Sequence, residues 1–133
     1  NTYSFDSIVD NLDDINEFYF YKDFLVVEQN CEDETTYSND KKFIEIFYQE
    51  GLKYSSKLKK DLYFEKIDLK SNDKIKVSGS MDFLDDYPPQ ILYVSTISSN
   101  DNSFSKDISK ELYIWDNDLK QFTMSQKENL ADN

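Results

Sequence analysis

The chain of 133 residues contains no histidine, and all fifteen of its basic residues are lysines. Histidine is the side chain most often used for proton transfer near neutral pH, and the Ser-His-Asp and Cys-His catalytic arrangements both need its imidazole. Catalytic zinc sites of the usual kinds need it as well. These absences exclude most familiar catalytic centres. We therefore expect a protein that is not an enzyme, with no cofactor and no metal site.

Glycine, proline and cysteine are also scarce, with two, two and one copies. Two glycines cannot build the glycine-rich loops that hold nucleotide phosphates. The single Cys31 can form no intrachain disulfide and no cysteine-based zinc site. Because the scarce residues have GC-rich codons, the composition indicates a low-GC bacterium, and the missing arginine alone says little about function.

Long hydrophobic runs are absent too, since no stretch of 18 apolar residues occurs. We expect no transmembrane segment in this chain. An anchor or signal segment upstream of residue 1 stays open, so the sequence predicts no single compartment.

The chain has a large excess of acidic residues, with a net charge of −12. Residues 1–40 hold eleven acids and one lysine, a net of −10, whereas residues 53–76 hold eight lysines and four acids, a net of +4. Residues 77–133 carry −6. A net negative charge repels nucleic-acid phosphates. We expect no direct nucleic-acid binding, and we interpret the lysine-rich stretch as an internal electrostatic complement or a soluble sheet face.

Two periodicities divide the chain. Apolar residues at positions 5, 8, 9, 12, 15 and 19 recur at helical spacing, which predicts an amphipathic helix over residues 4–19 with Ser4 as its N-cap. Alternating segments rich in Ile, Val, Tyr and Phe then predict strands. These segments are 24–29, 42–48, 61–69, 74–84, 90–97, 111–116 and 121–125. Residues 51–60 fit either a short helix or a hairpin, and residues 126–133 are expected to fray.

The predicted fold class is therefore α+β, in a single domain over residues 1–133. An N-terminal amphipathic helix packs on a largely antiparallel β-meander of about six or seven strands. Aromatic residues make up 16% of the chain and can fill its core.

Carboxylates offer two further kinds of chemistry. Glycoside hydrolysis needs two facing acids, and the candidates Glu45, Glu65, Asp68 and Asp82 lie on predicted strands. Acids that alternate with apolar residues normally form a solvated sheet face instead. Residues 116–118 begin like a calcium loop, but the turn-making glycine is missing. Turn formation explains this acidic segment better.

The remaining hypothesis is recognition of a basic protein partner. A rigid acidic surface attracts cationic proteins over long distances. We expect a non-catalytic inhibitor or immunity protein that occludes a basic toxin or enzyme. The alternatives are a surface-exposed or lipid-anchored accessory domain and a DNA mimic. The predicted partner-binding residues are Asp6, Asp10, Asp13, Asp14, Glu17, Glu32, Asp33, Glu34, Tyr19 and Tyr21.

Overall fold

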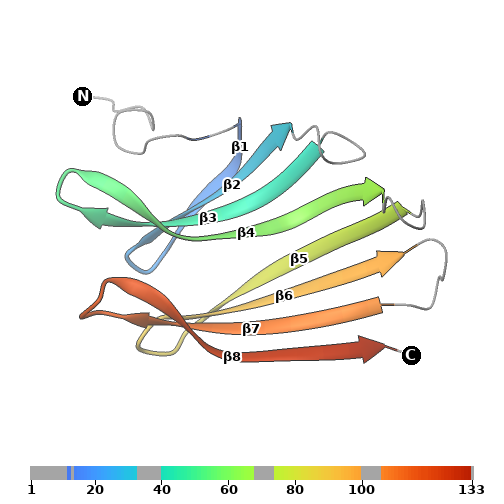
Figure 1. Ribbon diagram of the computed structural model, residues 1–133. Coiled ribbons are helices and arrows are strands. Elements are labelled where there is room, and N and C mark those ends of the chain that lie inside the picture. Colours follow the sequence, from blue (N-terminus) through green and yellow to red (C-terminus); the bar gives the residue numbers. More distant parts are fainter. Residues whose placement is uncertain (1–11, 13, 33–39, 68–73, 100–105, 133) are drawn as a thin grey trace.

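The structure, a computed structural model, describes residues 12, 14–32, 40–67, 74–99 and 106–132. This part of the chain forms one eight-stranded antiparallel sheet, in which every strand pairs with the next along the sequence (Figure 1). The strands are β1 (Asp14–Tyr21), β2 (Phe24–Glu32), β3 (Asp40–Glu50), β4 (Lys53–Ile67), β5 (Lys74–Leu84), β6 (Gln90–Ser99), β7 (Lys106–Asp116) and β8 (Gln121–Asp132).

The predicted N-terminal helix packed on the sheet is wrong, because the described residues are all-β. The last part of the predicted helix is strand β1, which pairs with β2. Its aromatic residues alternate rather than follow a helical stripe: Tyr19 and Tyr21 pack into the core, whereas Phe18 and Phe20 are exposed. Four consecutive aromatic residues favour a strand, so the fold class is not α+β. Residues 4–11 and 13 of the predicted helix lie outside the described residues.

The antiparallel order of the predicted strands is confirmed, and each of the seven falls largely within one of β2 to β8. Alternation in β5 is confirmed as well, since Val77 is buried and both Met81 and Phe83 pack against the core. The stretch 51–60 is a turn followed by the first half of β4. Strand β8 extends to Asp132, past the predicted end at residue 125.

The sheet folds back on itself between β4 and β5. These two strands pair only where residues 63–67 meet residues 74–78, and beyond that point they diverge (Figure 1). Gly79 stands at the crossing, where an added Cβ would lie 2.4 Å from the carbonyl oxygen of Asp61 and 2.6 Å from the hydroxyl of Tyr93. Glycine therefore allows the backbones to approach closely at this position.

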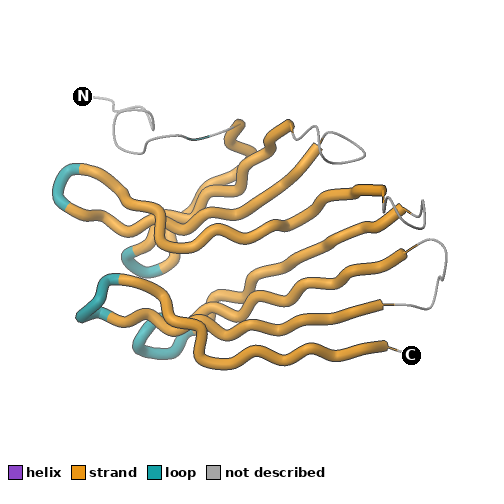
Figure 2. Tube along the Cα trace, viewed as in Figure 1, coloured by secondary structure: helices purple, strands orange, loops and turns teal. Residues whose placement is uncertain are grey.

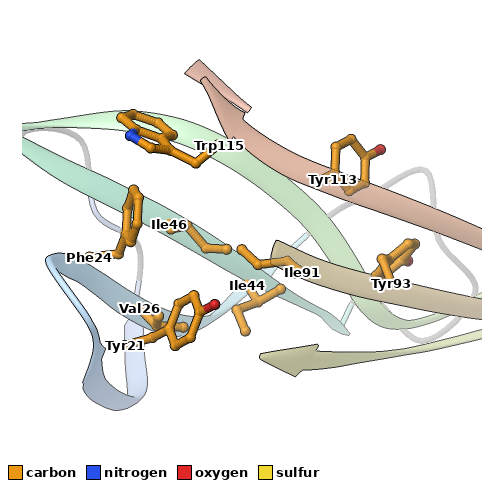
Figure 3. Close-up of a cluster of buried hydrophobic side chains, with 9 residues drawn as sticks. All are labelled: Tyr21, Phe24, Val26, Ile44, Ile46, Ile91, Tyr93, Tyr113 and Trp115. Carbon is orange, nitrogen blue, oxygen red and sulfur yellow. The ribbon is translucent and has the colours of Figure 1, made fainter. Parts of the chain in front are cut away.

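The main core lies between the first four strands and the last four. Figure 3 shows side chains from β1, β2 and β3 facing side chains from β6 and β7. The centre of the Trp115 ring lies 4.8 Å from the ring centres of both Phe24 and Tyr48, and 5.0 Å from that of Phe122. Burying each large apolar side chain contributes about 1.5–3 kcal/mol, so this cluster holds the two halves together. Its buried members are Tyr21, Phe24, Val26, Ile44, Ile46, Ile91, Tyr93, Tyr113 and Trp115.

A second apolar cluster lies on the opposite face of β2 and β3. It consists of Leu25, Val27 and Phe47, with Leu12 and Tyr54 packed against it. Strands β2 and β3 thus bury apolar residues on both faces, which explains their nearly continuous hydrophobic sequences.

The lysine-rich stretch is paired internally. Lys57 contacts Glu50, Lys74 lies 3.2 Å from Glu65, and Lys60 donates a 2.8 Å hydrogen bond to Glu111 of β7. Although burial alone would raise the pKa of Glu111, hydrogen bonds from Lys60 and Tyr113 outweigh it and lower that pKa. The interpretation of this stretch as an internal electrostatic complement is supported by these ion pairs.

Candidate binding site at the hairpin end

Four tight turns gather at one end of the sheet, which we call the hairpin end (Figure 2). They join β1 to β2, β3 to β4, β5 to β6 and β7 to β8, and comprise residues 22–23, 51–52, 85–89 and 117–120. An antiparallel meander places every second connection at the same end. Gly51 supplies the left-handed conformation of its turn, with a φ of 66°.

Hydrogen bonds hold two of these turns against each other. The hydroxyl of Tyr21 donates to the carbonyl of Leu84 at 2.6 Å and accepts from the amide of Gln90 at 3.2 Å. The ammonium of Lys22 donates to the carbonyl of Asp86 at 2.5 Å. These bonds join the β1–β2 turn to the β5–β6 turn across the fold-back, so they fix this part of the hairpin end from segments that are distant in the sequence.

The hairpin end contains a cleft of about 440 Å³. Phe24, Tyr48 and Trp115 contribute aromatic rings from the core to its lining, and Tyr87 with the two following prolines lines it from the β5–β6 turn. Trp115 is only 5% exposed, so it belongs to the floor of the cleft rather than to its rim. Its backbone amide donates a 2.9 Å hydrogen bond to the carbonyl of Pro89, which fixes that turn beside the floor.

Two acidic residues, Asp23 and Asp116, line the same cleft, and no lysine of the described residues does. Asp116 Oδ1 accepts hydrogen bonds from the amides of Asp118 and Leu119 at 2.9 and 3.1 Å, which orients this carboxylate. Neither Asp23 nor Asp116 forms an ion pair within the described residues. The cleft is therefore aromatic and acidic.

Two lysines at this end, Lys22 and Lys120, are engaged at their turns. Lys22 bonds the Asp86 carbonyl, and Lys120 donates to Asn117 Oδ1 at 2.8 Å while its ammonium lies 5.7 Å from the centre of the Tyr48 ring. These contacts hold both ammonium groups at the turns, outside the lining of the cleft.

Three of the four turns contain an exposed large hydrophobic residue, and the exposed Phe20 of β1 lies two residues before the fourth. Leu52 is 91% exposed, Tyr87 87%, Phe20 63% and Leu119 62%. These are the four most exposed large hydrophobic residues in the part of the chain that the structure describes. Turns usually carry Gly, Asn, Asp or Ser because of their backbone geometry, so leucine and tyrosine at turn tips have no local structural reason.

The structure places few of the predicted partner-binding residues at this site. Tyr21 is 9% exposed and belongs to the core, and Tyr19 is partly buried against Phe83 at 5.8 Å. Asp14 and Glu17 are exposed on β1, and Glu32 ends β2. The other predicted residues, Asp6, Asp10, Asp13, Asp33 and Glu34, lie outside the described residues.

The predicted carboxylate chemistry finds no common site. Glu45 accepts hydrogen bonds from Gln29 and Ser56, whereas Glu65 accepts one from Tyr63 and pairs with Lys74. Asp68 lies outside the described residues. The hydrogen bonds that the amides of Asp118 and Leu119 donate to Asp116 Oδ1 support the turn interpretation of residues 116–118. Among the described residues, no group of three or more possible metal ligands lies together.

Sequence analysis missed the residues of the cleft. Asp23, Tyr48, Tyr87 and Trp115 are far apart in the chain, and each alone is typical of a turn or a core. The sequence does contain one signal for this surface. Leu52 and Leu119 are large apolar residues that directly follow turn-forming residues, where polar residues are usual.

No described helix is long and apolar enough to cross a membrane. The chain matches none of the protein-family models, curated proteins or solved structures with which it was compared.

Proposed function

We propose that the protein is a non-catalytic binding protein that recognises a basic protein partner through its hairpin end. Its role would be that of an inhibitor or immunity protein that occludes a basic toxin or enzyme. The observation that carries this proposal is that four exposed hydrophobic residues, three in turns and Phe20 just before the fourth turn, lie at the same end of the sheet as an acidic cleft, whose lining includes one of them, Tyr87.

Physical reasoning favours a contact surface here. Single exposed hydrophobic residues are common on soluble proteins, but a group of them at one end of the molecule is typical of an interaction surface. Tyrosine and other large side chains provide most of the binding energy in such surfaces, and polar residues surround them. The hydrogen bonds that fix the β5–β6 turn hold Tyr87 on a preformed scaffold, which lowers the entropy lost on binding.

Charge determines the kind of partner that fits. The chain carries a net charge of −12, and the β5–β6 and β7–β8 turns contain Asp85, Asp86 and Asp118 in addition to the two cleft carboxylates. Such a field attracts cationic proteins and accelerates their association, most strongly at low salt. A basic protein is therefore the partner expected at this end.

The experiment compares capture of partners by the wild-type protein and by a triple variant, Leu52→Ser, Tyr87→Ser and Leu119→Ser. All three side chains are exposed, so we expect the variant to fold with nearly unchanged stability. A matched control carries Ile67→Ser, Ile97→Ser and Leu130→Ser, three exposed apolar residues at the other ends of their strands. The captured protein is identified and purified, and its affinity is measured by calorimetry at low and at high salt.

The proposal expects a basic protein that binds the wild type and the control equally, and that binds the triple variant at least about tenfold more weakly. Higher salt should slow its association. Capture of acidic or neutral partners only, or equal loss of binding in the control, would overturn the proposal.

A further inference from the structure

We infer that the cleft at the hairpin end receives an arginine side chain of the partner, with its guanidinium group between the aromatic rings and the carboxylates. This inference rests on the proposed function and identifies the chemistry at the centre of the contact. The juxtaposition that supports it is an aromatic lining with two acidic residues and, within the described part of the chain, no basic one.

The dimensions and lining of the cleft suit a side chain. Its volume of about 440 Å³ lies within the range of small-ligand sites. Tyr48, Trp115 and Tyr87 contribute aromatic groups to its lining, and a cation over an aromatic face is attracted by the negative charge of the ring. Two cation–ring contacts of this kind already occur within the chain at this end, where Lys22 lies 5.6 Å from the Tyr21 ring and Lys120 lies 5.7 Å from the Tyr48 ring.

The carboxylates provide the opposite charge. Asp23 and Asp116 have no ion-pair partner within the described residues, and the hydrogen bonds from the following amides engage only Oδ1 of Asp116. A free carboxylate beside an aromatic group is the environment that a guanidinium ion fits best, because this planar ion can stack on a ring while its N–H groups bond carboxylate oxygens. Lysine provides only a compact ammonium group and should bind more weakly.

A sugar is the main competing occupant, because aromatic rings beside aspartate and asparagine also suit carbohydrate. Two carboxylates without a basic residue favour a cation over a neutral ligand, since desolvating unpaired acids against a sugar leaves their charge uncompensated. The observations thus favour arginine, and a sugar becomes one arm of the test.

The experiment follows the indole N–H signal of Trp115, the only tryptophan, in nuclear magnetic resonance spectra of the nitrogen-15-labelled protein. The full chain is titrated with N-acetyl-arginine methylamide, with the corresponding lysine compound and with glucose. We expect a saturable shift with the arginine compound in the millimolar range, weaker binding of the lysine compound and no shift with glucose. High salt should weaken the arginine binding.

Variants locate the binding. Asp23→Asn and Asp116→Asn each remove one cleft charge, and Asn at position 116 keeps the oxygen that accepts the turn hydrogen bonds. We expect each to weaken arginine binding at least about fivefold. The matched control is Asp118→Asn, which removes an exposed acid of the same turn that does not line the cleft, and it should change the affinity less than about twofold.

Each result decides the inference. Absence of a saturable arginine shift, a shift with glucose alone, or equal weakening in all three variants would overturn it. The outcome is separable from that of the proposed function. If a basic partner is captured and the turn-tip variant loses it while arginine fails to bind, only the cleft inference is wrong. If no basic partner is captured, the proposed function is wrong whatever the titration shows.

Discussion

Replacing Tyr21 by phenylalanine tests the fold-back that builds the hairpin end. The Tyr21 hydroxyl donates to the Leu84 carbonyl at 2.6 Å and accepts from the Gln90 amide at 3.2 Å, and so ties β1 to the β5–β6 turn. Phenylalanine keeps the ring, whose centre lies 4.8 Å from that of Phe83. The substitution therefore removes the hydrogen bonds and leaves most of the packing in place.

The expected cost follows from those two bonds. Each contributes about 0.5–1.5 kcal/mol net, and more when a partly buried backbone group loses its partner. We expect the free energy of unfolding to fall by roughly 1–3 kcal/mol, which lowers the melting temperature by about 4–12 °C in a domain of this size.

Urea unfolding followed by the fluorescence of the buried Trp115 measures this loss. The matched control is Tyr87→Phe, because Tyr87 is 87% exposed and makes no hydrogen bond within the described residues. It should change the free energy of unfolding by less than about 0.5 kcal/mol. If Tyr21→Phe loses no more stability than this control, the two turns are not joined as described.

Two further predictions concern stability. Gly79→Ala would place its Cβ 2.4 Å from the Asp61 carbonyl oxygen and 2.6 Å from the Tyr93 hydroxyl, so it should lower the free energy of unfolding by about 1–3 kcal/mol. The control Ser80→Ala changes an exposed residue of the same strand and should leave that free energy nearly unchanged. Equal stability of the two variants in urea would contradict the strand crossing. The pKa of Glu111 is lower in the folded state than its ordinary value, so its contribution to stability is present above pH 4.5 and is lost as the pH falls below that value. Glu111→Gln should therefore be less stable than the wild type at neutral pH, with the difference shrinking in acid; a difference that stays constant across this range in denaturation curves would refute the assignment.

The sequence predicted secondary structure correctly where a segment followed a single periodicity. Residues 74–84 alternate cleanly, and they form a strand whose residues Met81 and Phe83 pack against the core as their pattern predicts. The N-terminal prediction failed because Ile15 and Tyr19 fit a helical stripe as well as a strand. Pairing with β2 favours the strand, since it lets Tyr19 and Tyr21 reach the core from one face. Tertiary pairing of this kind outweighs local spacing.

The candidate binding site could not be predicted in the same way. Its cleft combines Asp23, Tyr48, Tyr87 and Asp116, which come from four separate hairpins. A meander places their turns at one end, but only the divergence of β4 and β5 brings the two halves face to face. That divergence depends on the close approach at Gly79, and one glycine within an alternating strand does not specify a fold-back. The acidic excess was visible in the sequence, whereas its relation to the exposed hydrophobic turn tips was not.

The central claim is that the hairpin end is the surface that binds a partner. Amide hydrogen exchange of the complex with the captured basic protein tests it most directly, because it reports every backbone amide that the partner covers. The account predicts new protection at the amides of the four turns, residues 22–23, 51–52, 85–87 and 117–120, and unchanged exchange at the opposite strand ends near Ile67, Ser99 and Lys106. Protection confined to those opposite ends, with the turns exchanging as in the free protein, would contradict it.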